Sequence, residues 1–316
     1  MTASYIRHII DRVNEVTARC GPVLLYGENI DTGSRISGLA RGLTVNPAGR
    51  ILNVGNCELA HCGIGFGVMI DRGNAALFMK QLDFLLLGLD QLVNTFNFIR
   101  AYRPKDQVGS FTIFLIICDQ GHQGPQSSMN SASDFASMAN VDVYCLNAAS
   151  DAAAVVGDRF VAGGFRVMCL SQRLFGAPAL DLPAQWHSAD RAIFRYRSGD
   201  DATLLCYNFA LRQGVELADR AAAAGLATDL FHANFVPGAD LSPLVESCKR
   251  TGKLAILDDS KSVTKFGDML LARLLTARVD VEVLNLTRRG CPDRDYGVCG
   301  DQFVVDRDAV AAFMRA

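Results

Sequence analysis

One acidic side chain stands apart from the other carboxylates of this sequence. Glu58 follows Asn56 and Cys57 and comes directly before a run of small residues, 60–67, with a helical pattern. A carboxylate in the first turn of a helix interacts favourably with the helix dipole. A carboxylate held there is also placed to share a proton with a bound heterocycle. On the residues alone the structural role comes first, and the catalytic role stays open.

The histidines and serines offer less chemistry. None of the five histidines has a spacing typical of metal ligands, and no serine stands in a nucleophile-elbow setting. His61 falls early in an expected helix and His122 in a loop rich in Gly and Gln, which favours surface or capping roles for both.

The ten cysteines indicate free thiols rather than a metal or redox site. The closest pairs, Cys57 with Cys62 and Cys291 with Cys299, lack the two-residue gap of a zinc or redox motif. Several others sit in or at the end of apolar runs, where a thiol behaves as a small hydrophobic group. We therefore expect no metal ligands in this chain and a reducing compartment.

Glycines 63, 65 and 67 resemble a nucleotide-binding motif but fall inside the helical pattern. A dinucleotide fingerprint needs a strand before it and a glycine at the start of the helix. We expect these small residues to allow close helix packing. No Walker lysine motif is present, so we expect no pyrophosphate cradle in this chain.

Composition bounds the class of protein. The chain has 316 residues, of which 50% are hydrophobic, and a formal net charge of −2. It is too apolar to be disordered and lacks the basic excess of a nucleic-acid binder. Its longest apolar candidate for a membrane span, 84–89, is bounded by Asp83 and Asp90, and residues 1–12 do not resemble a signal peptide. We expect a cytoplasmic protein that does not contact membranes.

Apolar runs of strand length alternate with helical patterns along most of the chain. We expect strands at 23–26, 75–79, 111–118, 141–146, 165–170, 202–207, 228–231, 254–257 and 281–286. We expect helices at 6–16, 59–70, 85–98, 132–138, 151–160, 211–224, 241–251 and 266–277. This alternation predicts an α/β fold with mainly parallel sheets. The rhythm breaks at Pro178 and Pro183, which predicts a domain at 1–175, a linker at 176–198 and a domain at 199–316.

Several motifs together resemble the beta subunit of thiamine-diphosphate-dependent 2-oxo acid dehydrogenases, a relative of the transketolases. The similarity extends over nearly the whole chain. The matching segments are 24–29 with its Gly-Glu pair, 56–58, 83–94, Arg100, 124–126, 251–254 and 266–267. The resemblance implies a pyrimidine-binding domain followed by a transketolase C-terminal-like domain.

The resemblance also implies specific chemistry. Thiamine diphosphate acts as an electron sink, and the protein tunes it. Glu58 matches the glutamate that shares a proton with the aminopyrimidine ring, and Phe84 matches the aromatic residue that stacks on this ring. Glu28 and Gln81 are further cofactor-binding candidates, since they stand at positions of the matching motifs.

The family binds the cofactor's diphosphate through Mg²⁺ with a Gly-Asp-Gly motif, which this chain lacks. The resemblance therefore implies an alpha-type partner chain that supplies those ligands, with the cofactor between subunits. The expected assembly is an α2β2 heterotetramer.

Two departures from the family leave the reaction open. Ser127 replaces the histidine that follows Gly-Pro-Gln, and Gln81 replaces an aromatic residue. Ser127 and the nearby His122 are therefore catalytic candidates, with His122 a partial substitute for the lost base. The leading hypothesis is a beta-type subunit that acts on a 2-oxo acid or a ketol. The alternatives are the C-terminal half of a split transketolase and a non-catalytic structural subunit.

Overall fold

The structure is a computed structural model and describes residues 3–121, 128–288 and 303–315. Its first sheet contains β1 (Val23–Gly27), β2 (Arg50–Asn53), β3 (Asn74–Gln81), β4 (Ser110–Ile117), β5 (Asp142–Cys145) and β6 (Gly164–Ser171). These six strands are parallel and lie in the order β2-β1-β3-β4-β6-β5.

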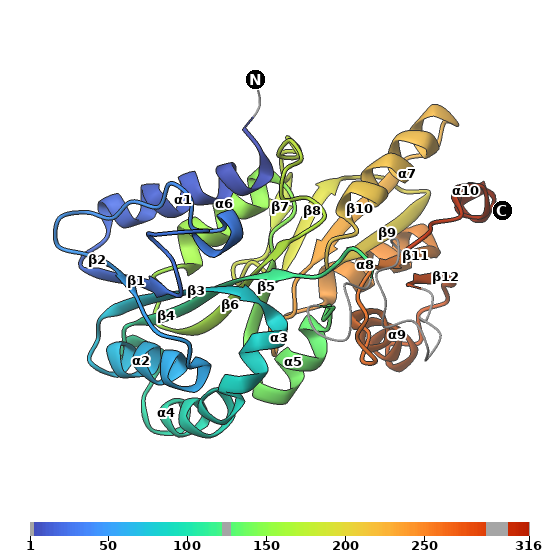
Figure 1. The fold of residues 1–316 in the computed structure, drawn as a ribbon. Helices are drawn as coiled ribbons and strands as arrows, with labels where there is room; N and C mark the ends of the chain where they lie inside the picture. Colours follow the sequence, from blue (N-terminus) through green and yellow to red (C-terminus); the bar gives the residue numbers. More distant parts are fainter. Residues whose placement is uncertain (1–2, 122–127, 289–302, 316) are drawn as a thin grey trace, which may run out of the picture.

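The helices of the first domain cover both faces of this sheet (Figure 1). They are α1 (Tyr5–Arg19), α2 (Glu58–Ile70), α3 (Leu82–Leu85), α4 (Phe96–Tyr102), α5 (Ala132–Ala139) and α6 (Ala149–Arg159). Helices α1 and α6 pack on one face, and α2, α4 and α5 on the other. Alternate residues of β3 enter the two cores: Ala76 and Phe78 enter the first, and Ala75 and Leu77 the second. Apolar residues on both faces explain why such strands are buried throughout.

The second sheet is mixed, in the order β12-β11-β9-β10-β8-β7. Its strands are β7 (Trp186–His187), β8 (Ile193–Arg197), β9 (Ala202–Tyr207), β10 (Thr228–Ala233), β11 (Lys253–Asp258) and β12 (Glu282–Thr287). Its helices are α7 (Leu211–Ala223), α8 (Ser242–Thr251), α9 (Phe266–Thr276) and α10 (Arg307–Arg315). Strand β8 runs antiparallel to β10 and to β7, and the other pairings are parallel. The predicted class, α/β with two mainly parallel sheets, is confirmed.

The structure corrects two expectations. The segment 176–198, expected as a linker, contains β7 and β8, which pair in the second sheet. Residues 85–98 do not form one helix: a 3₁₀ turn η2 (Leu86–Gly88) and a π-helical turn η3 (Gln91–Thr95) separate α3 from α4. Gly88 lies against α2 so closely that an added Cβ would stand 2.5 Å from Cys62 Sγ. The chain therefore follows the surface of α2 at this point.

Candidate functional site

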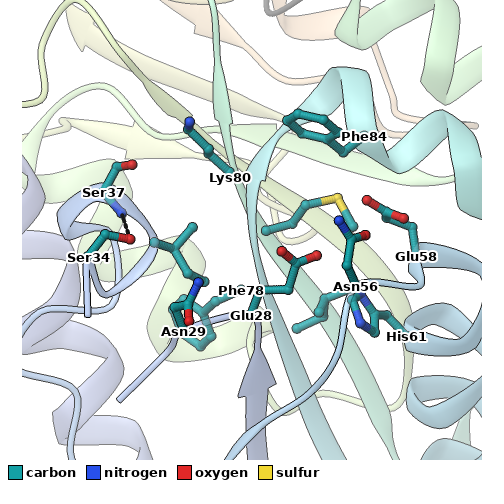
Figure 2. A pocket seen from close by; sticks show the side chains of 13 residues that line it. Glu28, Asn29, Ser34, Ser37, Asn56, Glu58, His61, Phe78, Lys80 and Phe84 are labelled. Atoms are coloured by element: carbon teal, nitrogen blue, oxygen red, sulfur yellow. Dashed lines mark hydrogen bonds between the residues drawn. The ribbon is translucent and has the colours of Figure 1, made fainter. Parts of the chain in front are cut away.

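A cavity of about 250 Å³ lies at the carboxyl ends of β1 and β3, beside the start of α2 (Figure 2). Ligand sites of parallel α/β sheets occur at this edge. Its polar and aromatic lining includes Glu28, Asn56, Glu58, His61, Lys80 and Phe84. Three of the sequence-predicted residues, Glu28, Glu58 and Phe84, are thus brought together. Glu28 directly follows β1, Glu58 begins α2, and Phe84 lies in α3, which follows β3.

Glu58 is the first residue of α2 and is only 8% exposed. With the amide of Asn56 turned to donate, its Nδ2 lies 3.3 Å from each carboxylate oxygen of Glu58. No positively charged side chain pairs with Glu58 among the described residues. A buried carboxylate is normally paired, so Glu58 is available to a donor group from a ligand.

The packing of α2 fixes the position of Glu58. Gly65 lies against the ring of Phe111 in β4, where an added Cβ would stand 2.3 Å from a ring carbon. Around Gly67 there is no atom within 4 Å of an added Cβ. The expected role of the small residues, close packing of the helix, is confirmed at Gly65. This contact seats the helix against the sheet.

His61 is buried, not at the surface, and it ties down the loop before Glu58. Its Nε2 lies 2.6 Å from the carbonyl oxygen of Gly55, and the Tyr26 hydroxyl donates to the His61 carbonyl at 2.6 Å. These bonds hold the start of α2 to β1. His61 therefore helps to position Glu58 through the loop that precedes it, and His61 also lines the cavity.

Phe84 and Gln81 occupy different surroundings. Phe84, in α3, lines the cavity and lies near Glu58 in Figure 2. Gln81 is 3% exposed, does not line the cavity, and approaches Cys118 Sγ at 3.1 Å through Nε2. Burial raises the pKa of the Cys118 thiol to about 12, so this cysteine is a neutral core group. The other two site predictions, His122 and Ser127, lie outside the described residues.

Sequence reasoning missed two features of the cavity. One is Lys80, the only lysine or arginine among the described residues that line it. The other is the wall formed by the loop after β1, which includes Ser34 and Ser37. Arg35, Ile36 and Ser37 have φ values of 47°, 47° and 54°, in the left-handed region. Such a conformation costs about 1–2 kcal/mol for each non-glycine residue, and it is characteristic of functional segments. A lysine directly after the apolar run 75–79 was the available signal for Lys80.

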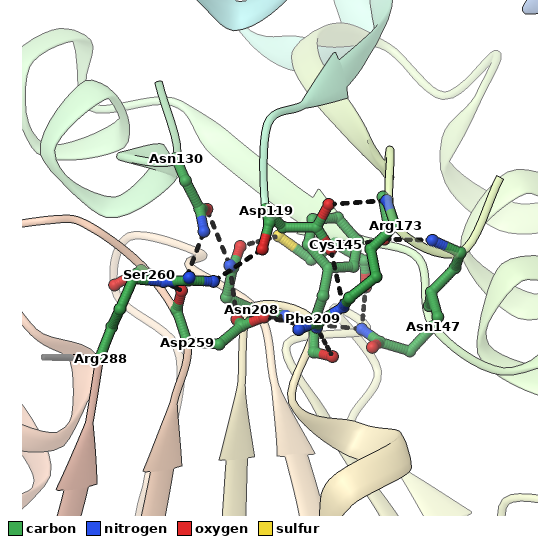
Figure 3. A network of polar contacts seen from close by, with 12 residues as sticks. Asp119, Asn130, Cys145, Asn147, Arg173, Asn208, Phe209, Asp259, Ser260 and Arg288 are labelled. Carbon is green, nitrogen blue, oxygen red and sulfur yellow. Dashed lines mark hydrogen bonds and ion pairs between the residues drawn. The ribbon is translucent and has the colours of Figure 1, made fainter. Parts of the chain in front are cut away.

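The other half of the same sheet edge is filled by a network of polar side chains between the two domains (Figure 3). This interdomain network consists of residues that closely follow strands of both sheets and of Asn130, which precedes α5. They are Asp119, Asn130, Arg173, Asn208, Asp259 and Arg288. The two carboxylates of the set, Asp119 and Asp259, have no exposed surface.

Every carboxylate oxygen of the interdomain network accepts a hydrogen bond. Asp259 accepts from Asn208 Nδ2 at 2.7 Å, from the Phe209 amide at 3.0 Å and from Arg173 at 2.7 Å. Asp119 accepts from the Ser171 hydroxyl at 2.5 Å and from the Arg173 amide at 3.0 Å. The Arg288 guanidinium donates to the main-chain oxygens of Asp119 and Asp259 at 2.7 and 2.8 Å. These contacts hold the two domains together and leave none of the four carboxylate oxygens without a hydrogen bond.

Burial raises the pKa of Asp119 to about 6, and the neighbouring guanidinium of Arg173 opposes that rise. The nearby carboxylate of Asp259 also raises the pKa of Asp119.

The described residues contain no group of three or more His, Cys, Asp or Glu side chains able to hold a metal ion. None of the described helices combines the length and apolar character needed to cross a bilayer.

The arrangement of two α/β domains is that of the transketolase-like fold. A solved structure with this fold is a split-gene transketolase in the form of an inactive beta4 tetramer. It aligns over 98% of this chain and 96% of its own, with a TM-score of 0.69 and 16% sequence identity. At this identity the similarity establishes the fold. Neither family models nor curated proteins match the chain.

Proposed function

We propose that this chain is the pyrimidine-binding half of a two-chain thiamine diphosphate enzyme. The observation that carries the proposal is Glu58, a buried carboxylate that has no charged partner in the described part of the chain and lines a cavity together with the Phe84 ring. The bound cofactor would supply an electron sink for cleavage next to a carbonyl group. The donor set fits its aminopyrimidine ring, since a carboxylate matches a ring nitrogen and Phe84 offers a face for stacking.

The residues of this chain then have distinct tasks. Glu58 holds a proton between its carboxylate and the ring nitrogen, and a site with little water strengthens that hydrogen bond. Asn56 orients the carboxylate, and His61 fixes the loop that carries both. Phe84 excludes water from one face of the ring. Glu28 adds a second acceptor at the end of β1.

The cavity is smaller than the roughly 300–1,000 Å³ of typical sites for whole ligands. The end of the cavity at Glu58 and Phe84 suits one ring of a cofactor, and the diphosphate and Mg²⁺ would need ligands from elsewhere. Exposed apolar side chains lie close to Glu58 and Phe84 in sequence: Leu59 is 43% and Leu87 63% exposed. Apolar groups of this kind around a site favour burial by a partner chain. The proposed partner is an alpha-type chain with a Gly-Asp-Gly motif, in an α2β2 assembly.

Two reactions fit such an enzyme. Ketol transfer is favoured by the fold shared with a split transketolase. Decarboxylation of a 2-oxo acid with transfer of the product is favoured by the resemblance of residues 83–94 to the dehydrogenase subunit. A non-catalytic structural subunit is the third alternative, because the solved beta4 tetramer is described as inactive.

The test is co-expression with a candidate alpha-type chain, followed by measurement of hydrogen–deuterium exchange at the cofactor C2 carbon by NMR. Glu58→Gln should leave assembly and cofactor binding intact and slow the exchange by about 100-fold or more. Glu246→Gln, at an exposed acid of α8, is the matched control and should exchange at the wild-type rate. Exchange by Glu58→Gln at the wild-type rate would remove the catalytic role of Glu58. A complex that binds no thiamine diphosphate would refute the proposed function.

A further inference from the structure

Lys80 is turned into the cavity by an irregularity in β3. The pairing of β3 with β4 places Met79 opposite Leu115 and Gln81 opposite Ile116, so Lys80 is an extra residue in the ladder. Met79 and Gln81 are 6% and 3% exposed, whereas Lys80 is exposed. A β-bulge re-aims a side chain in this way, and bulges are common beside active sites. The register therefore removes Lys80 from the core and presents it to the cavity.

The ammonium group of Lys80 forms no hydrogen bond or ion pair with any part of the chain that the structure describes. Two carboxylates, Glu28 and Glu58, line the same cavity without pairing with it. In Figure 2 Lys80 lies on the side of Ser34 and Ser37, away from Glu58 and His61. The cavity thus has an acidic side and a basic side.

The loop opposite the acidic side adds hydroxyl groups to the ammonium. Ser34 Oγ accepts a hydrogen bond from the Ser37 amide at 3.3 Å, which fixes the left-handed turn. Both serines line the cavity together with Lys80. An ammonium and hydroxyl donors form a set that matches the oxygens of a carboxylate or a phosphate.

We propose that Lys80 is a specificity-determining residue that binds the anionic end of the substrate, a carboxylate or a phosphate. This role rests on the proposed function, because it takes the substrate of that reaction as the source of the anion. Glu58 would repel an anion from the acidic side, so the two charged sides fix the direction in which substrate enters. A neutral ketone would lack this contact and bind without Lys80.

The first test uses the isolated chain and does not depend on the proposed function. Lysine side chains are labelled by reductive ¹³C-dimethylation, and the Lys80 resonance is assigned by its absence in Lys80→Arg. Titration with inorganic phosphate or with glycolate should shift that resonance, and chloride at equal ionic strength should not. The Lys105 resonance, from a side chain that is 73% exposed, is the internal control. A Lys80 resonance that responds no more than that of Lys105 would overturn the proposal.

The second test uses the two-chain complex with pyruvate, fructose 6-phosphate and uncharged dihydroxyacetone. Lys80→Met should raise KM for the anionic substrate by about 10- to 100-fold and leave kcat and the KM for dihydroxyacetone nearly unchanged. Lys80→Arg should restore most of the lost affinity. The substrate whose KM responds distinguishes a carboxylate from a phosphate.

Weakened assembly of Lys80→Met with an unchanged KM would show instead that Lys80 pairs with the partner chain. A complex inactive on all three substrates would count against the proposed function, and the NMR titration would still decide the role of Lys80.

Discussion

The carboxyl edge of the first sheet is used in two different ways. At β4 and β6 the residues after the strands meet those of the second sheet, and the buried carboxylates Asp119 and Asp259 are fully hydrogen-bonded. At β1 and β3 the edge is open, and Glu58 and Lys80 have no charged partner among the described residues. Both halves carry charged side chains near the carboxyl ends of strands: Glu58, Asp119 and Asp259 are buried, and Lys80 is exposed.

The difference separates structural charges from charges kept for a ligand. A buried carboxylate costs free energy unless it is paired and hydrogen-bonded, and the interdomain network meets that condition within the chain. In the cavity, Glu58 is buried without a charged partner among the described residues, so this condition is not met there. A fold that retains unmatched charges gives up stability at that place, which is typical of functional sites. Four measurements test this contrast.

The largest effect is expected at Asp259. Asp259→Ala removes the acceptor shared by Arg173, Asn208 and the Phe209 amide, and should lower the free energy of unfolding by about 3–5 kcal/mol. Urea denaturation measures it. Asp219→Ala, which breaks the exposed pair with Arg197, is the control and should cost less than about 1 kcal/mol. Equal losses for the two variants would show that the network is not a structural lock.

Asp119 should make stability depend on pH. Its folded pKa of about 6 exceeds the ordinary 3.8, so the folded state binds more protons between these values. The contribution of Asp119 to the free energy of unfolding therefore falls as pH rises from about 4 to 6, by about 2–3 kcal/mol in all. Asp119→Asn should remove this part of the pH dependence in urea titrations at several pH values. Asp268→Asn, at an exposed position of α9, should retain the wild-type dependence.

Close packing of α2 predicts the next effect. Gly65→Ala forces a Cβ against Phe111 and should destabilise the chain by about 1–3 kcal/mol, as measured by thermal or urea unfolding. Gly67→Ala meets no atom within 4 Å and should be neutral or stabilising by up to about 1 kcal/mol. The opposite ranking would mean that α2, and with it Glu58, is not seated as described.

The smallest effect on stability is expected at Glu58 itself. Glu58→Gln removes a buried charge that no described cation balances, so the free energy of unfolding should stay the same or rise by up to about 1 kcal/mol. The contrast with Asp259→Ala is the direct test of the two halves. A loss at Glu58 as large as that at Asp259 would make Glu58 a structural acid.

Much of the fold could be predicted from the sequence because its central strands are apolar on both faces. Each of the nine expected strands corresponds to a strand of the structure. Strand β2 was missed because Arg50 and its neighbours are mostly exposed at the sheet edge. Strands β7 and β8 were missed because prolines and charged residues surround them. They form through backbone pairing with neighbouring strands, which requires neither a long segment nor an apolar run.

The candidate site was predictable where a residue stands in a local sequence motif. It was not predictable where strand register or contacts between distant residues determine the surroundings of a side chain. Glu58 and Phe84 were predicted from motifs that resemble a known family, and both line one cavity. The direction of Lys80 depends on a shift in register against β4, which no local pattern shows. The interdomain network joins residues far apart in the chain, so only the tertiary structure shows that these charges are satisfied.

Within residues 3–121, 128–288 and 303–315, every side chain that lines the cavity comes from the segment between Glu28 and Phe84. The interdomain network, in contrast, draws on positions from Asp119 to Arg288. One continuous segment therefore encodes the contribution that the described residues make to the cavity. Recombination between related genes could exchange that segment and alter specificity in one event, while the residues that hold the two domains together would be inherited unchanged.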